Sequence, residues 1–441
     1  MSLEYNKITK RVEIELANGT TIEIKGDTSS EQHLLSINVL EELSYLNNNP
    51  LGKVSSNECE IELYDITKDL IPSNVNSKYK GLLDNSAKFR VYVSVDGVEA
   101  ELGEYYVTEW QSDQDINSFN IRISGTDLIG YLREKSVKLI PVNENTSVAE
   151  YYKLLFEAVG LQSSQYSISS TLSQNFKFSV ISGNKFGDIV NTVAEGTVTC
   201  VFTDRQGVIH VEDALWSKNN VGILSGSVHI FKGKLKNNGL SDYNGVVVKY
   251  KEVSKSELSE LLAEVKGYKL LNSRAEIKGI KSEKAIYCVD YVDIQNSNNV
   301  GLIAECTDVD YTQNSIDLII ETQATGGMII DISVYGKKIE ETDCEIKRDI
   351  QTGKSDNSLE IDNVLIQSKE YADWYINKLT EYIKSRKYNL VVRAKCTPTI
   401  TLGDKITVKI NNADIDGEYK VLSNKIEFTA GCTCELLLTT E

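Results

Sequence analysis

Hydrophobic and polar positions alternate along most of the chain, and this alternation predicts β-strands. Residues two apart point to one face of a sheet, so each such run predicts a strand with one buried face. The first run spans residues 11–25 and is interrupted by Asn18-Gly19, a pair typical of a tight hairpin turn. The pattern predicts further strands in the segments 59–64, 89–123, 198–211, 228–250 and 277–339. Within the last segment, 316–322 and 328–334 are expected to pair as a hairpin.

A helical spacing of apolar residues appears in a few shorter segments. Ser147 and Glu150 form a capping box before a predicted helix that ends at Gly160. Helices are also predicted at 186–194 and, after Ser254 with Glu257, through about 265. The clearest helix begins near Ser368 and carries a broad apolar stripe. Its aromatic residues are expected to lie in a core and not at a ligand site.

A five-residue pattern, Gly-Glu-Tyr-x-Val, occurs twice in the chain. The fixed positions of the two copies are Gly103, Glu104, Tyr105, Val107, Gly417, Glu418, Tyr419 and Val421. Alternating strands precede the copies at 89–95 and 406–410, and others follow at 119–123 and 434–438. Chance recurrence is the alternative, but the matching flanks favour an internal duplication that gives two similar antiparallel β-domains. Three such chains in a closed ring would present six similar units.

Length, charge and composition narrow the functional classes. A chain of 441 residues predicts about three domains at roughly 150 residues each. The net charge is −17 and the basic residues are dispersed, which disfavours direct nucleic-acid binding, although a negative wall suits a conduit through which nucleic acid slides. We find no apolar signal segment and no run long enough to span a membrane, so we expect no membrane insertion and synthesis in the cytoplasm.

No catalytic, metal or cofactor motif is recognisable in the sequence. The three histidines lie outside any HExxH, GxSxG or phosphate-loop context, and the eight cysteines form no CxxC pair. We therefore expect no enzyme, no cofactor and reduced thiols. A glycosidase pair of carboxylates stays open, because its defining separation is a distance in space and not in sequence.

The last part of the chain resembles the phage tail baseplate hub family. The resemblance rests on the helix near Ser368, the segment Thr397–Ile406 with Gly403 and Asp404, and the second Gly-Glu-Tyr copy. Residues 97–132 and 329–339 are also similar to parts of that family. The resemblance implies an α+β, mainly β, multidomain fold with two tube-type β-barrels and a mixed α/β part, and a helix packed across a barrel.

The resemblance also implies a domain organisation. We expect a first barrel at 1–140, a mixed α/β domain at 141–215, and a second barrel made of 216–252 with 363–441. A helix and β region at 253–362 is expected to pack on the middle domain. The chain ends directly after the second barrel, so no appended enzymatic domain is expected.

The function implied by this resemblance is structural. Members of the family are homotrimers that adapt a hexameric tail tube, or distal tail protein, to a trimeric spike or fibre. They lie at the tail tip of a virion, or of a contractile injection system or R-type bacteriocin particle, assembled in the bacterial cytoplasm. Related barrels occur in tail tube proteins and in secretion-system spike hubs. The alternatives are a tail-associated cell-wall hydrolase and a carbohydrate-binding tail adhesin.

Overall fold

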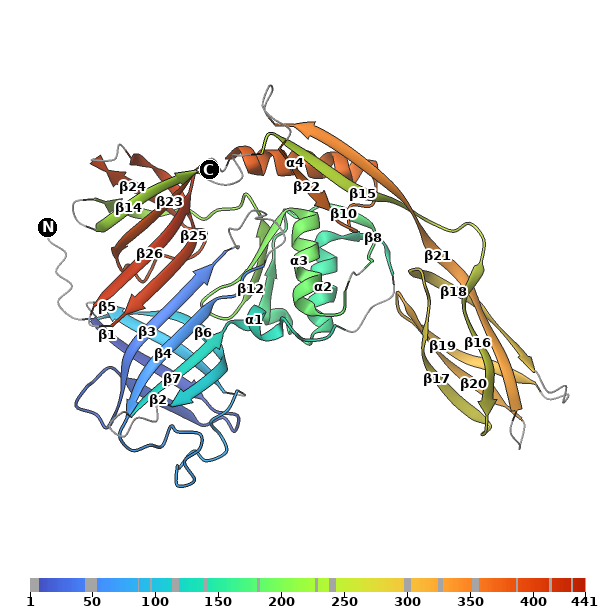
Figure 1. Cartoon of the computed structure of the whole chain (residues 1–441), viewed down its shortest axis with the longest axis horizontal. Coiled ribbons are helices and arrows are strands. Elements are labelled where there is room, and N and C mark those ends of the chain that lie inside the picture. Colours follow the sequence, from blue (N-terminus) through green and yellow to red (C-terminus); the bar gives the residue numbers. More distant parts are fainter. Residues whose placement is uncertain are drawn as a thin grey trace.

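The structure of the chain is a computed structural model. It describes residues 8–43, 54–85, 87–95, 97–112, 119–137, 142–180, 183–226, 229–237, 243–296, 303–323, 328–350, 357–385, 388–411, 415–429 and 431–440. The molecule is elongated, with two β-units at one end, helices in the middle and a strand-rich projection at the other end (Figure 1). Strands dominate and helices are few, so the predicted mainly β, α+β fold class is confirmed.

The first β-unit is an antiparallel sheet made from the N-terminal part of the chain. Its strands are β1 (Ile8–Glu15), β2 (Thr21–Lys25), β3 (Gln32–Glu42), β4 (Glu58–Asp65), β5 (Lys88–Val95), β6 (Val98–Ser112) and β7 (Asn120–Thr126). They lie in the order β3-β4-β7-β6-β5-β1-β2, and the sheet curls until β2 approaches β3. The predicted hairpin at 11–25 is confirmed, because β1 and β2 pair with Ile14 opposite Ile22.

The second β-unit combines two distant parts of the chain. Its strands are β13 (Asn220–Ser225), β14 (Ile230–Asn237), β23 (Tyr388–Lys395), β24 (Lys405–Ile410), β25 (Ile415–Phe428) and β26 (Cys432–Thr439). They lie in the order β14-β23-β26-β25-β24-β13, with β13 parallel to β24. The two units share one continuous hydrophobic core, which includes Val91, Tyr105, Val408 and Leu438.

The middle of the molecule is a mixed α/β region. Its elements are α1 (Leu128–Leu132), β8 (Glu144–Ser147), α2 (Val148–Ala158), the 3-10 turn η1 (Ser163–Gln165), β9 (Tyr166–Ile168), β10 (Asn175–Phe178), α3 (Phe186–Thr197), β11 (Thr199–Thr203) and β12 (Ile209–Asp213). The Ser147 hydroxyl accepts a hydrogen bond from the Glu150 amide at 3.1 Å, as an N-cap does. The predicted helices at 147–160 and 186–194 are thereby confirmed.

The predicted helix near Ser368 is α4 (Lys369–Ser385). Its apolar stripe includes Tyr371 and Tyr375, and both are buried in the core that also contains α2 and α3. Strands β15 (Gly245–Lys255) and β22 (Ser358–Asp362) contribute to the same core. The helix therefore shares its core with the middle region, which differs from the expectation that it packs across the second barrel.

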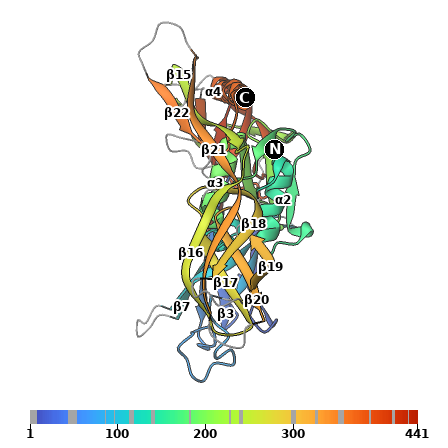
Figure 2. The ribbon, with the colours of Figure 1, turned by 90° about the vertical axis from the view of Figure 1, so that its right-hand side faces the viewer.

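Residues 256–339 form a projection with a core of its own. Its strands are β16 (Glu260–Leu270), β17 (Arg274–Lys281), β18 (Ile286–Asn296), β19 (Ala304–Tyr311), β20 (Ser315–Thr322) and the first part of the long β21 (Met328–Asp349). Figure 2 shows these strands extending away from the helices. The apolar faces of β20 and β21 meet in this core through Leu318, Ile320, Ile330 and Ile332. A small cluster around Val142, Phe178 and Val253 joins the base of the projection to the middle region.

Two expectations for this projection are wrong. The segment 254–265 is not a helix, because it contains the end of β15 and the start of β16. Its Glu, Leu and Ala content favours a helix locally, but pairing of Ala263 with Val334 on the apolar strand β21 overrides that preference. The expected 316–334 hairpin does not form either. Strand β20 pairs with β17 and β19, and β21 pairs with β15, β16 and β18.

Candidate assembly site at the joint of the two β-units

The two Gly-Glu-Tyr copies occupy equivalent places in the two β-units. In the first unit, β6 lies beside β5 with Tyr105 opposite Phe89 and Gly103 opposite Val91. In the second unit, β25 lies beside β24 with Tyr419 opposite Ile406 and Gly417 opposite Val408. The repeat seen in the sequence is therefore also a repeat of strand pairing.

The equivalence continues beyond the motif. The pairing of β6 with β7 shifts by one residue directly after Val107, and the pairing of β25 with β26 shifts directly after Val421. The amide of Val107 donates to the Ala87 carbonyl at 3.0 Å, and the amide of Val421 donates to the Asp404 carbonyl at 2.9 Å. A β-bulge at the same place in both units strengthens the local twist and redirects the strand that follows.

The first tyrosine is packed more tightly than the second. Tyr105 is 1% exposed, and its hydroxyl donates to the Leu102 carbonyl at 2.9 Å. Gly103 has φ = +144°, and a Cβ there would lie 2.6 Å from the Tyr105 hydroxyl oxygen, so glycine is required. In the second unit a Cβ on Gly417 would lie 3.5 Å from the ring of Tyr419, which is 8% exposed. Burial raises the pKa of the Tyr105 hydroxyl well above its usual value.

The motif glutamates bind side chains of other strands in the same β-unit. Glu104 forms ion pairs with Arg90 and, at 3.7 Å, with Lys88. Glu418 accepts a hydrogen bond from the Asn220 side-chain amide at 2.6 Å. Glu104 thus links the adjacent strands β6 and β5, whereas Glu418 on β25 reaches past β24 to β13, and both carboxylates have structural partners.

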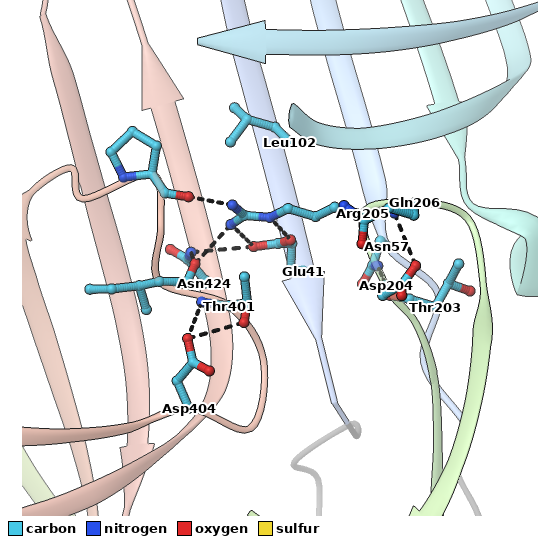
Figure 3. A network of polar contacts seen from close by, with 12 residues as sticks. Glu41, Asn57, Leu102, Thr203, Asp204, Arg205, Gln206, Thr401, Asp404 and Asn424 are labelled. Carbon is cyan, nitrogen blue, oxygen red and sulfur yellow. Dashed lines mark hydrogen bonds and ion pairs between the residues drawn. The ribbon is translucent and has the colours of Figure 1, made fainter. Parts of the chain in front are cut away.

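The Leu-Gly-Asp turn holds the start of β24 against the middle region. Asp404 accepts hydrogen bonds from the Thr401 amide at 2.7 Å and from its hydroxyl at 3.0 Å (Figure 3). Gly403 has φ = +79°, and a Cβ there would lie 2.4 Å from the indole of Trp216. Glycine thus allows both the left-handed turn and the close approach of Trp216.

The two units are joined by antiparallel pairing of β25 with β3. After its bulge, β25 leaves β24 and runs beside β3, from Ser423 opposite Glu42 to Phe428 opposite Ile37. The last part of β25 in the second unit therefore pairs with β3, the edge strand of the first unit. The described strands of both units form one 13-stranded sheet.

A buried ion pair fixes this joint to the middle region. Arg205, from the turn between β11 and β12, donates two hydrogen bonds of 2.7 Å to the Glu41 carboxylate on β3 (Figure 3). The exposed fractions of these side chains are 7% for Arg205 and 3% for Glu41. Burial by itself lowers the pKa of Arg205, but the Glu41 carboxylate outweighs it, so the pKa is raised.

The rest of the network comes from the second unit. Arg205 also donates to the carbonyls of Pro398 and Ile400, the latter at 2.8 Å. The Asn424 side-chain amide lies 3.3 Å from a Glu41 carboxylate oxygen and 3.2 Å from the Ile400 carbonyl oxygen. One guanidinium thus connects three parts of the chain, and the removal of either charged partner would leave a buried charge unpaired.

An apolar cluster lies at the same junction. Leu43 from the first unit, Phe202 from the middle region and Leu402 and Leu422 from the second unit pack together there. Sequence analysis did not identify Glu41, Arg205 or Asn424 as important residues. One signal for this network was present in the sequence, a charged residue directly after the apolar run of β3. The residues that it contacts are far away in the sequence and could not be predicted from it.

The described residues show little sign of catalytic chemistry. Among them no group of three or more histidine, cysteine or acidic side chains is placed to hold a metal ion. Burial raises the pKa of Asp127 to about 6, a value seen for catalytic acids. However, Asp127 is 2% exposed and accepts hydrogen bonds from the amides of Asn57 and Gly130, so it acts as the N-cap of α1. No helix in the described part of the chain is long and apolar enough to cross a membrane.

Two solved structures share this architecture over almost the whole chain. A tail protein from Neisseria meningitidis MC58 superimposes with a TM-score of 0.56 at 9% identity, covering 98% of this chain and 97% of that one. The 43 kDa tail protein of prophage MuSo2 from Shewanella oneidensis gives a TM-score of 0.54 at 11% identity, covering 97% and 98%. This chain has the fold of phage tail proteins.

Sequence comparison adds nothing to this structural match. No protein-family model matches the chain, and no curated protein matches it either. The tail-protein fold is thus preserved where sequence similarity has fallen to about a tenth, since a β-sheet depends on backbone pairing and on the alternation of buried positions. The aromatic helix near Ser368, together with the short Gly-Glu-Tyr and Leu-Gly-Asp patterns, carried the resemblance that predicted the tail-protein fold.

Proposed function

We propose that this protein is the structural baseplate hub of a phage tail or of a phage-tail-like contractile injection particle, such as an R-type bacteriocin. In this role a homotrimer adapts a sixfold tail tube, or distal tail protein, to a threefold spike or fibre. The observation that carries the proposal is the pair of register-matched β-units in one chain. Three chains present six similar units, so a threefold object gains a face that suits a sixfold partner.

The tail-protein fold supports a structural role. The place of action in this proposal is the tail tip, with assembly in the bacterial host cytoplasm. No cofactor and no specific nucleic-acid contact are part of it. No observation on this chain specifically favours the wall hydrolase or the tail adhesin.

The proposed domain organisation follows the two units. As a proposal, the boundaries predicted from the sequence are kept: a first barrel at 1–140, a mixed region at 141–215, a split second barrel at 216–252 with 363–441, and a region at 253–362 that contains the projection. The boundary between 140 and 141 lies outside the described residues. This division assigns β15 and α4 to the second barrel, although both contribute to the core of the middle region.

The test of the hub role is the assembly state of the purified chain. Native mass spectrometry should give a mass of three chains, and class-averaged electron microscopy should show a ring with six similar lobes. A co-purified hexameric tube protein should bind one face of this ring. A protein that stays monomeric both alone and with the tube partner would contradict the proposal, as would lysis of purified cell wall by the chain.

A further inference from the structure

The joint inside the chain has a counterpart that is left open. In the second unit, the part of β25 beyond its bulge is covered by β3 of the first unit. The equivalent part of the first unit is Glu109–Ser112, the part of β6 beyond its own bulge. On the side of β6 away from β7, no strand among the described residues pairs with Glu109–Ser112. Within the described ranges, the first unit therefore has an unpaired strand edge at the place where the equivalent edge of the second unit is already paired.

The strand equivalent to β3 in the second unit is β14. Strand β3 pairs with β4, which pairs with β7, and strand β14 pairs with β23, which pairs with β26. When the paired residues are traced from strand to strand, from each Gly-Glu-Tyr motif to the edge of its unit, Leu235 of β14 occupies the place that Val39 of β3 occupies in the other unit. Strand β14 is the last strand of the sheet, and no strand among the described residues pairs with its outer edge.

Burial differs sharply between these equivalent strands. Val39 is 1% exposed, whereas Leu235 is 50% exposed and Phe231 on the same strand is 60% exposed. An edge strand with exposed apolar side chains and free backbone groups is a template for pairing with another chain, and soluble proteins usually cover or protect such an edge. Within the described part of the chain, one strand segment and one apolar edge strand therefore lack a pairing strand, and they are equivalent to the two sides of the internal joint.

We propose that the Glu109–Ser112 segment of β6 pairs with β14 of a second copy of this chain. Transfer of the internal register to this contact makes the pairing antiparallel, with Trp110 opposite Asn237, Gln111 opposite Lys236 and Ser112 opposite Leu235. The contact is heterologous, since it joins different surfaces of two copies, and such contacts terminate only by closing a ring. The proposal rests on the proposed homotrimer and specifies how its subunits meet.

The contact between copies differs chemically from the joint within the chain. The positions of Asn424 and Glu41, which meet in the buried network, are occupied in the new contact by Trp110 and Asn237. The buried ion pair with Arg205 therefore has no counterpart in the contact between copies. Backbone pairing and the apolar side chains of β14 stabilise the contact instead, so it can form after each chain has folded.

A cysteine pair tests both the contact and its register. Directly opposed residues on antiparallel strands have Cα atoms about 4.5–5.5 Å apart, within the range that a disulfide spans. The double variant Ser112→Cys with Leu235→Cys should therefore give a covalent ladder that ends at three chains on non-reducing gels. The matched control Glu109→Cys with Leu235→Cys places the thiols three residues out of register and should give none beyond that of the parent protein, whose eight cysteines are free.

A second variant measures the contribution of the exposed edge. Leu235→Lys should weaken self-association at least tenfold, as followed by sedimentation at a series of concentrations. Leu258→Lys changes an apolar residue that is 78% exposed on the projection, and it should leave self-association unchanged.

The outcomes separate this inference from the hub role. A trimer in which the 112–235 pair fails to cross-link, or in which both cysteine pairs cross-link equally, overturns the strand contact and leaves the threefold assembly standing. A protein that is monomeric at every concentration and with the tube partner overturns both. Cross-linking at 112–235 alone, with a tenfold loss for Leu235→Lys, supports both.

Discussion

The two β-units share five strands in corresponding order, β3-β4-β7-β6-β5 and β14-β23-β26-β25-β24, and the same bulge, but they differ in how tightly the motif is packed and in which strand pairs with their edges. Tyr105 and Gly103 of the first unit fit one another closely, whereas Tyr419 and Gly417 of the second unit do not. The edge strand β3 pairs with β25, while no strand in the described ranges pairs with the outer edge of its counterpart β14. The pattern of backbone pairing is thus common to both units, whereas their side chains determine how tightly each unit is packed.

The largest expected effect comes from breaking the internal joint. Arg205→Met leaves the Glu41 carboxylate buried without its partner, and the loss of one member of a buried pair costs about 3–5 kcal/mol in free energy of unfolding. Urea unfolding of the full chain measures this loss. The matched control is Lys409→Met, which breaks the exposed pair with Asp416 on the second unit and should change stability far less. Equal effects of the two variants would contradict a special role for the joint.

Truncation of the two motif tyrosines sharpens the packing difference. Tyr105→Ala should destabilise the protein by about 4 kcal/mol, because it removes a fully buried ring and leaves a cavity. Tyr419→Ala should cost about 2 kcal/mol, because that ring is less buried and its surroundings are looser. Both values come from denaturant midpoints in the same buffer. Unchanged unfolding of both variants would overturn the assignment of these strands to a buried core.

A pH experiment distinguishes the ends of the two units. Asp127 follows β7, while Thr440 holds the equivalent place after β26, so only the first unit has an acid there. Burial raises the pKa of Asp127 to about 6, so its contribution to stability is fully present below about pH 4 and is lost as the pH rises through 6. Between pH 4 and 7 the wild type should therefore lose up to about 3 kcal/mol relative to Asp127→Asn. Parallel stability curves for the two proteins would contradict the shifted pKa.

Alanine at the motif glycines gives the smallest contrast. Gly103→Ala should cost about 2 kcal/mol, because φ = +144° is strained for alanine and the new Cβ meets the Tyr105 ring. Gly417→Ala should cost less than about 1 kcal/mol, because its φ is not positive and its Cβ would make only ordinary contacts. Thermal melts of both variants test the difference. Similar losses would mean that the two motifs are packed alike.

Sequence analysis predicted the parts of the fold that depend on local pattern. The hairpin of β1 and β2, the capped helix α2 and the aromatic helix α4 were all predicted close to their observed positions. The projection was predicted less well, because β16 contains residues that favour a helix and becomes a strand only through its partner β21. Strand partners in the projection could not be chosen from alternation, since several strands there have similar apolar faces.

The sequence by itself determined the repeat, because both copies of the motif stand between alternating runs, and such runs predict strands with one buried face. It also determined the glycine positions, since positive φ values and close ring contacts exclude other residues. Only the tertiary structure decided that Arg205 meets Glu41 and Asn424, and that β3 pairs with β25 while β14 has no such partner among the described strands. These contacts depend on which distant segments of the chain come together in space, and a local pattern of residues does not specify those segments.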